Sequence, residues 1–384
     1  MNKPEWSVLP PLSLYIHIPW CVRKCPYCDF NSHQADQTLT EKEPLYIEAL
    51  LRDLENDLPL AQGRSISSIF IGGGTPSLFS AQSIKQLLKG INNRISINEN
   101  AEITLEANPG TFEQDKFSDF FEAGINRLSI GIQSFEQEKL SALGRIHNSD
   151  EAKRAITIAK QAGFTNFNID LMHGLPNQSL DDALSDLQTA IDFNPTHLSW
   201  YQLTIEPNTF FYNHPPTLPN DDLLWDIQEA GQQLLADNGY AQYEVSAYSK
   251  SNKQSAHNIN YWQFGDYLGI GAGAHGKITH LEKQEVSRLW KTRLPKDYLN
   301  ANRNFIAGSN TLNAHDLLLE GLMNVLRLNE GVPLDLFYER TGLSATDVIN
   351  QLIVASDFLT HGNRVQCNEF GRRYLNNVLA LFNR

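Results

Sequence analysis

Three of the chain's four cysteines, Cys21, Cys25 and Cys28, stand close together in the spacing C-x3-C-x2-C. A structural zinc site normally takes four ligands, usually as two separated pairs, and this group does not supply them. Three thiolates on one loop suit an iron–sulfur cubane that leaves one iron without a protein ligand, open to chelation by a small molecule. The alternatives are three incidental thiols, or a zinc knuckle completed by His17 or His33.

Polar residues and glycines follow several apolar runs further along the chain. The run Gly72-Gly73-Gly74-Thr75-Pro76 follows one of them, and Glu106, Gln133 and Asp170 end three others. Glycines let backbone groups approach a ligand closely, although a tight turn is the plain alternative. Polar side chains at the ends of successive apolar strands are hard to explain as core, so they predict a ligand pocket.

The elements that position these residues alternate regularly in the first half of the chain. Short apolar runs predict strands at 12–18, 68–73, 102–107, 127–132, 166–171 and 197–203. Helical periodicity between them predicts helices at 44–57, 80–91, 114–124 and 149–163. Six β–α alternations imply a parallel sheet with right-handed crossovers. Because six units are too few for a closed eightfold barrel, the prediction is an α/β fold with a partial (β/α)6 TIM-like barrel.

The rhythm changes after residue 205. A clear helix at 221–239 is followed by shorter strand-like pieces and by the glycine-rich run at 269–276. From about residue 311 the pattern is helical, with a short hairpin expected near 358–367, which resembles a small winged-helix-like module. We therefore expect a partial barrel over 1–205, a barrel extension over 206–308 and a C-terminal helical domain over 309–384.

Charge and composition exclude several classes of protein. A net charge of −13 argues against a nucleic acid partner, because phosphate binding needs a basic surface. No apolar run approaches the roughly 18 residues that a membrane span needs, and the first residues have no signal-peptide core. The cysteines therefore read as reduced thiols in a cytoplasmic protein.

The cysteine motif, with Tyr27 before its last cysteine, resembles that of the radical S-adenosylmethionine (SAM) superfamily. The resemblance implies a [4Fe–4S] cluster on Cys21, Cys25 and Cys28, with the amino and carboxylate groups of SAM on the fourth iron. One electron from such a cluster cleaves SAM to a 5′-deoxyadenosyl radical. The cofactor supplies the difficult chemistry, and the protein supplies orientation and exclusion of water.

Within the superfamily, the runs YIHIPWC, GGGTPS, RLSIGIQSF and DLMHGLPNQ resemble the HemN-like branch, and the likeness extends from Leu12 to the C-terminus. It implies that Arg145 pairs with the SAM carboxylate, that Asp170 binds ribose hydroxyls and that the glycine motif receives the amino group. The SAM-binding residues implied in full are Tyr15, Tyr27, Gly73, Gly74, Thr75, Glu106, Gln133, Arg145 and Asp170.

Two activities compete within this branch. Oxygen-independent coproporphyrinogen III dehydrogenase, a radical SAM decarboxylase, has a longer N-terminal extension and a fourth cysteine two residues after the third. This chain has Phe30 at that position and reaches its first cysteine at residue 21. Both departures count against the decarboxylase. A radical SAM enzyme with an unrelated substrate, such as a methyl acceptor, and a purely structural cluster protein fit the motifs less well.

The second activity is that of the heme chaperones of the branch, whose motif H-N-x-x-Y-W matches residues 257–262. An imidazole is a standard axial ligand of heme iron, so His257 is the candidate ligand. Tyr261 and Trp262 are candidates for stacking on the porphyrin. In isolation, a histidine beside aromatic residues is more often a loop or core histidine.

The resemblance therefore implies a heme chaperone with a [4Fe–4S] cluster, SAM and heme as its cofactors, without coproporphyrinogen dehydrogenase activity. Its expected partners are heme and client heme apoproteins, such as respiratory heme enzymes at the membrane face. A homodimer is left open, and no catalytic residue is assigned.

Overall fold

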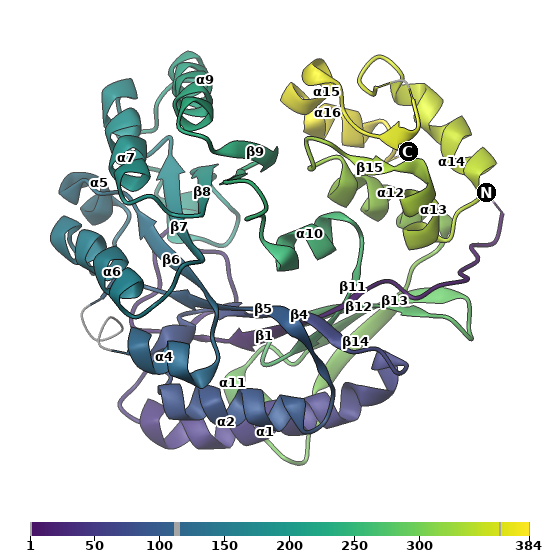
Figure 1. The fold of residues 1–384 in the computed structure, drawn as a ribbon, viewed down its shortest axis with the longest axis horizontal. Coiled ribbons are helices and arrows are strands. Elements are labelled where there is room, and N and C mark those ends of the chain that lie inside the picture. The colour runs from purple at the N-terminus through teal and green to yellow at the C-terminus, as the bar shows by residue number, and fades with distance from the viewer. Residues whose placement is uncertain (1, 111–115, 361, 384) are drawn as a thin grey trace.

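The computed structural model describes residues 2–110, 116–360 and 362–383. Its main sheet has twelve strands (Figure 1). These are β1 (Leu12–Ile18), β4 (Ile66–Gly73), β5 (Ile97–Ala107), β6 (Arg127–Gln133), β7 (Phe167–His173), β8 (His197–Gln202), β9 (Ala241–Glu244), β10 (Ala247–Ser249), β11 (Asp266–Ile270), β12 (His275–His280), β13 (Glu285–Lys291) and β14 (Ile306–Thr311). They lie in the order β14-β13-β12-β11-β1-β4-β5-β6-β7-β8-β10-β9.

The centre of this sheet is parallel, because β1, β4, β5, β6, β7 and β8 pair in chain order and in one direction. The predicted partial (β/α)6 TIM-like barrel is therefore confirmed. Figure 1 shows the crossover helices on the outside of the curved sheet. The helices of this half are α1 (Leu39–Ala61), α2 (Ala81–Asn92), α4 (Phe117–Ala123), α5 (Gln137–Ala142), α6 (Ser149–Gln161) and α7 (Leu180–Asp192), with a 3-10 turn η1 (Pro76–Leu78).

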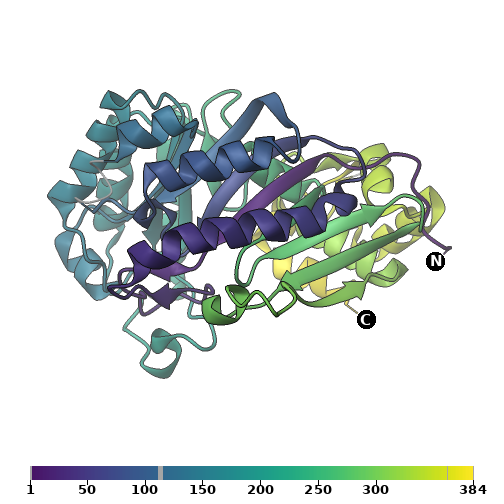
Figure 2. The same cartoon turned by 90° about the horizontal axis from the view of Figure 1, so that it is seen from below.

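Local sequence signals set the helix boundaries. Ser80 caps α2 by accepting a hydrogen bond from the backbone N–H of Ser83, and Asn148 and Glu151 form a capping box at the start of α6. The expected helix at 114–124 corresponds to α4, and its residues 114 and 115 lie outside the described residues. Figure 2 shows α1 and α2 side by side along the outer face of the sheet.

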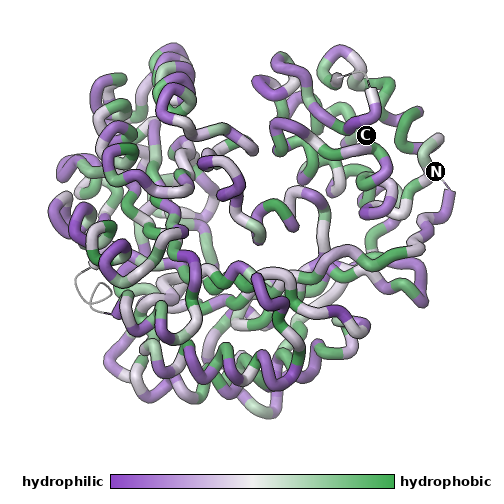
Figure 3. The backbone as a smooth tube through the Cα atoms, viewed as in Figure 1, coloured by the Kyte–Doolittle hydropathy of each residue, from purple (hydrophilic) through white to green (hydrophobic). Residues whose placement is uncertain are grey.

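Side chains alternate across the strands as the pleat requires. On β1, Leu14, Ile16 and Ile18 are buried in the main core with residues of α1, while Tyr15 and His17 face the inside of the barrel. The outer helices show the matching pattern, since hydrophobic and hydrophilic residues alternate along α1 and α2 in Figure 3. The core therefore lies between the sheet and its helices, and the concave face is left for polar and aromatic side chains.

Strands outside the six predicted β–α units extend the sheet at both edges. β11 pairs in parallel with β1, and β12, β13 and β14 continue in antiparallel pairing. The glycine-rich run at 269–276 makes the turn between β11 and β12, where Gly271 and Gly273 have φ values of +106° and +84°. Remaining helices here are α8 (Phe210–Asn213), α9 (Asp221–Asp237), α10 (Ala256–Trp262) and α11 (Pro295–Tyr298).

The C-terminal part packs as a separate hydrophobic core, which also receives Trp6 from the N-terminal segment. The ends of the short hairpin expected at 358–367 pair as predicted, through an antiparallel bridge between Leu359 and Cys367, and β16 within it also pairs with β15. His361 of that hairpin lies outside the described residues. The elements are α12 (Ala314–Val325), β15 (Val332–Pro333), α13 (Leu334–Thr341), α14 (Ala345–Leu352), η2 (Ile353–Ala355), β16 (Arg364–Val365), α15 (Glu369–Arg373) and α16 (Leu375–Ala380).

Candidate functional site

The cysteine loop follows β1 and is tied at both ends. The short strands β2 (Trp20–Cys21) and β3 (His33–Gln34) pair in parallel and close the loop at its base. Cys21, Cys25 and Cys28 are free and half-buried. Burial raises the pKa of the Cys21 and Cys28 thiols, so both are protonated near neutral pH when nothing is bound to them.

The glycine motif brings the end of β4 against this loop. Gly73 has a φ of +115°, and the backbone N–H of Gly74 donates to the carbonyl of Ile18. A Cβ at Gly74 would lie 2.6 Å from the carbonyl oxygen of Trp20, so only glycine allows this approach. The close packing accounts for part of the glycine run without any ligand.

Three polar side chains at the strand ends face the same space. Glu106 of β5 accepts a hydrogen bond from the backbone N–H of Gly73 at 3.0 Å. Burial, together with the nearby charge of Asp170, raises the pKa of Glu106 to about 7. Burial also raises the pKa of Asp170, although Asn168 and Ser129 donate hydrogen bonds to it.

Gln133 completes this set at the end of β6. It has a φ of +73°, a left-handed conformation that is uncommon outside glycine and costs about 1 kcal/mol. The side chain accepts a hydrogen bond from the Tyr201 hydroxyl at 2.8 Å. Strain of this kind persists where the surroundings hold it and often marks a functional site.

Arg145 places a buried positive charge beside the cysteine loop. Its Nη2 donates to the carbonyl of Gly131 at 2.6 Å and to Oδ1 of Asn108 at 2.7 Å, and its Nη1 lies 3.6 Å from Sγ of Cys25. Its Nε is buried without a hydrogen-bond partner among the described residues. A buried cation whose contacts are neutral groups favours an anionic ligand.

Together these residues line one cavity of about 340 Å³. The cavity brings together all but one of the predicted cluster and SAM residues: Cys21, Cys25, Tyr27, Cys28, Gly73, Gly74, Thr75, Glu106, Gln133, Arg145 and Asp170. The sequence interpretation missed Asn108, Ser129, Ser199 and Tyr201, which line it as well. Ser199 and Tyr201 stand two apart on β8, a period that places them on one face of the strand and that could have indicated them.

Tyr15 lies outside the lining of this cavity. Its hydroxyl hydrogen-bonds Nδ1 of His17 at 2.8 Å, and its ring stacks on Phe70 and on His257. Burial raises the pKa of Tyr15 well above its usual value, so the hydroxyl stays protonated. This places Tyr15 deeper in the barrel, between the cysteine loop and α10.

The H-N-x-x-Y-W motif forms the short helix α10, which Figure 1 shows near the middle of the molecule. His257 is 2% exposed, with its ring centroid 4.7 Å from that of Phe70 and 4.3 Å from that of Tyr261. Burial lowers the pKa of His257 to about 3, so the imidazole is neutral, as a metal ligand must be. Nδ1 of His257 and Nε1 of Trp262 are buried without hydrogen-bond partners among the described residues.

The cysteine loop suits a cubane better than a single metal ion. In the part of the chain that the structure describes, no three His, Cys, Asp or Glu side chains converge as ligands of one metal ion. In a cubane each thiolate binds a different iron, so the three sulfurs need not converge on one point. Three free thiols on one loop, facing one cavity, match that donor set.

Known proteins match this chain in two family models and over nearly its full length. Residues 15–190 match the model of the radical SAM superfamily, and residues 312–373 match that of the HemN C-terminal domain. A protein named heme chaperone HemW from Escherichia coli is 52% identical over 97% of this chain and 98% of its own length. The protein of the same name from Haemophilus influenzae is 53% identical, with the same coverage. This chain belongs to the HemW family of radical SAM proteins.

Among solved structures, the chain resembles coproporphyrinogen III oxidase (HemN) from E. coli, described as a radical SAM enzyme, with a TM-score of 0.80. The match covers 97% of this chain and 90% of that one at 24% identity, which supports the shared fold alone. Membership of the radical SAM superfamily implies a [4Fe–4S] cluster and SAM as cofactors. Within the described residues, no helix combines the length and apolar character needed to cross a membrane.

Proposed function

We propose that this protein is a heme chaperone that holds a [4Fe–4S] cluster and SAM, binds heme and delivers it to client apoproteins. The observation that carries the proposal is the identity of 52–53%, over 97% of the chain, to proteins named heme chaperones. The clients proposed are respiratory heme enzymes. The H-N-x-x-Y-W motif on α10 supplies the candidate heme ligand.

The cavity beside the cysteine loop is the proposed cofactor site. Cys21, Cys25 and Cys28 hold the cluster, which together with SAM supplies one-electron chemistry when bound. Arg145 offers its guanidinium to the SAM carboxylate, supported by its burial and by its unpartnered Nε. Asp170 accepts from the ribose hydroxyls, and the backbone at Gly73, fixed by Glu106, receives the amino group.

His257 is the proposed axial ligand of heme, flanked by Tyr261 and Trp262. The neutral imidazole with a free Nδ1 supports this role. The cavity beside α10, lined by Tyr261, Trp262 and Tyr267 among others, measures about 180 Å³. Because pockets for drug-sized ligands measure about 300–1,000 Å³, a porphyrin reaches His257 only if part of α10 or its neighbours moves aside.

The competing function is oxygen-independent coproporphyrinogen III dehydrogenase. Phe30 occupies the position where that enzyme has its fourth cysteine, and its side chain is 63% exposed at the end of the cysteine loop. Phenylalanine has no thiol, so position 30 cannot supply an additional thiolate. Formation of protoporphyrinogen IX distinguishes this dehydrogenase from the chaperone.

The proposal is tested by hemin titration of the anaerobically reconstituted protein. The wild type should give a histidine-ligated Soret spectrum, and His257→Ala should lose that spectrum and bind hemin at least about tenfold more weakly. His275→Ala is the matched control, since His275 is exposed and lies on β12, outside the motif, and it should bind like the wild type. Unchanged hemin binding by His257→Ala would remove His257 as the ligand.

A second assay separates the two functions. The reconstituted protein is incubated with coproporphyrinogen III, SAM and a reductant, and protoporphyrinogen IX is measured. We expect none above the level without SAM. Formation of product with enzymatic turnover would contradict the chaperone and favour the dehydrogenase.

A further inference from the structure

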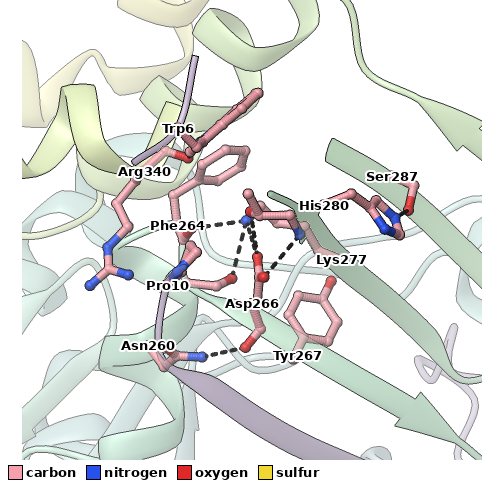
Figure 4. A network of polar contacts seen from close by, with 12 residues as sticks. Trp6, Pro10, Asn260, Phe264, Asp266, Tyr267, Lys277, His280, Ser287 and Arg340 are labelled. Carbon is pink, nitrogen blue, oxygen red and sulfur yellow. Dashed lines mark hydrogen bonds and ion pairs between the residues drawn. The ribbon is translucent and has the colours of Figure 1, made fainter. Parts of the chain in front are cut away.

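The C-terminal end of α10 rests on a buried cation. Figure 4 shows Lys277 of β12 pointing at the turn that ends the helix. Its Nζ donates to the carbonyl of Phe264 at 3.0 Å, reaches the carbonyl of Gly265 at 3.5 Å and lies 4.2 Å from the centroid of the Phe264 ring. These carbonyls belong to the turn that follows the helix, and buried carbonyls need a hydrogen-bond donor, which Lys277 supplies.

Asp266 joins this turn to three other parts of the chain. Its carboxylate lies 2.9 Å from Nζ of Lys277 and accepts from Nη1 of Arg64 and from the backbone N–H of Thr279. Its carbonyl accepts from Nδ2 of Asn260 on α10, and its N–H donates to the carbonyl of Pro11. One residue thus connects α10, β12, the segment before β4 and the N-terminal segment.

The turn itself needs such support. Phe264 has a φ of +55°, a conformation that costs a residue with a side chain about 1–2 kcal/mol. Gly265 has no room for a Cβ because the side chain of Asn260 occupies that space. Conformations of this kind persist only where the surroundings over-determine them, and here Lys277 and Asp266 do so.

A contribution to stability does not by itself explain why a buried ion pair of Lys277 and Asp266 is present. Burial opposes the ionisation of Asp266, but the charges of Lys277 and Arg64 outweigh it and lower its pKa. Buried ion pairs often contribute little net stability compared with apolar residues of similar volume, while they can fix one arrangement of the chain. The arrangement that this pair fixes is the end of the helix that carries His257.

The two ends of α10 are held differently. At the N-terminal end, Glu102 accepts from the backbone N–H of Ala256 at 3.0 Å, and the preceding segment 251–254 is exposed. His257 lies in this first turn. The N-terminal end is thus held by hydrogen bonds to Ser255 and Glu102, whereas the C-terminal end is held by a buried ion pair.

We propose that Lys277 and Asp266 are positioning residues for His257, which hold the C-terminal end of α10 against β11 and β12 while heme binds. This inference rests on the proposed function. Without the ion pair of Lys277 and Asp266, which is the anchor of α10, the turn at 263–265 no longer keeps one conformation. His257 and Tyr261 then shift relative to Tyr15 and Phe70.

The chain offers a matched control for this proposal. Lys291 of β13 is buried like Lys277 and pairs with Asp53 at 2.6 Å and with Asp57 at 2.7 Å. Both carboxylates belong to α1 on the outer face of the sheet, so this pair does not touch α10. Lys277→Met and Lys291→Met therefore remove equally buried charges from the two faces of the sheet.

The experiment compares both variants in the full chain by amide hydrogen exchange and hemin titration. We expect amides of residues 256–265 to exchange at least about tenfold faster in Lys277→Met, and hemin to bind about tenfold more weakly with an altered Soret band. Lys291→Met should lower thermal stability, yet keep exchange in α10 and hemin binding as in the wild type. Should Lys277→Met not fold, Asn260→Ala carries the same expectations for α10.

Equal exchange of residues 256–265 in the two lysine variants would overturn the inference, whatever happens to heme. Wild-type hemin affinity and Soret band in Lys277→Met would also overturn it. Hemin binding that does not depend on His257 would instead contradict the proposed function, while faster exchange in Lys277→Met would still uphold the anchor. The two failures are therefore distinguishable.

Discussion

The cysteine-loop cavity and the α10 region differ in how ready they are for a ligand. The cavity is open and lined by polar groups that lack full partners, as the unpartnered Nε of Arg145 shows. Around α10, by contrast, His257 lies stacked among aromatic rings and is almost fully buried. The first site is formed before its ligand arrives, whereas the second must open to admit a porphyrin.

The pKa values of buried carboxylates also differ between the cavity and the α10 region. The pKa of Glu106 and of Asp170 is raised, so these carboxylates cost free energy in the absence of a ligand. At the end of α10 the charges are paired, and the pKa of Asp266 is lowered. The carboxylates with raised pKa values lie where ligand binding can satisfy them, while the paired charges hold a segment in place.

The largest effect should come from the cysteines. Replacing Cys21, Cys25 and Cys28 together by Ala removes the proposed cluster ligands, so the visible absorption of the reconstituted cluster should disappear. Cys367→Ala is the control, because that thiol is buried in the C-terminal core, far along the chain from the loop. The cavity beside the cysteine loop and the cavity beside α10 have no lining residue in common. Hemin should therefore still give a His257-dependent Soret band in the triple variant. Cluster absorption that survives the triple replacement would refute the assignment.

Arg145→Ala should weaken SAM binding by about tenfold to a hundredfold, the worth of a charge-assisted hydrogen bond of about 1.5–3 kcal/mol. Arg145→Lys should recover part of this loss, since a lysine keeps the charge but not the planar fork. Arg94→Ala serves as control, because Arg94 follows α2 and pairs with Glu55 of α1, away from the cavity. Equilibrium binding of SAM to the reconstituted protein is the measurement, and equal affinity of Arg145→Ala and the wild type would argue against a carboxylate at this position.

A smaller effect is expected from Glu106 on the pH dependence of stability. Its pKa is about 7 in the folded protein and near 4.5 in an unfolded chain, so between these values the folded state holds a proton that the unfolded state has lost. The free energy of unfolding should therefore fall as pH rises from 4.5 to 7, by at most about 1.4 kcal/mol per pH unit from this group.

Glu106→Gln removes that contribution and keeps an acceptor for the N–H of Gly73. Denaturant unfolding of the SAM-free variant and wild type across this range measures the difference. The variant should gain stability relative to the wild type as pH rises. Parallel pH profiles would show that Glu106 does not titrate in this window.

The sequence predicted the site best at residue types that have few structural roles in proteins. Cysteine spacing, the glycine motif and the strand-end residues Glu106 and Asp170 led to one cavity, because the carboxyl ends of parallel strands meet at one end of a barrel. Tyr201 and Ser199 were missed because serine and tyrosine on a strand have many ordinary roles. The place of Tyr15 depends on its hydrogen bond to His17, which no local pattern specifies.

The second half of the chain was less predictable. Pairing of β11 with β1 joins residues about 250 positions apart, and such non-local pairing leaves no periodic signal. The local hairpin at 358–367 was predicted, but the pairing of its β16 with β15, about 30 residues earlier, was not, for the same reason. Likewise, Lys277 and Asp266 are unremarkable in the sequence, and only the fold shows that both meet the end of α10.

Heme transfer tests the central claim most directly. The hemin-loaded wild type is mixed with increasing amounts of an apo respiratory cytochrome, and the shift of the Soret band is followed in time. Apomyoglobin in excess, which only captures released heme, gives the rate of spontaneous dissociation. A chaperone should transfer heme to the cytochrome faster than this rate, with a rate that rises with client concentration and with His257-dependent loading. Transfer at the apomyoglobin rate, independent of client concentration, would contradict the account.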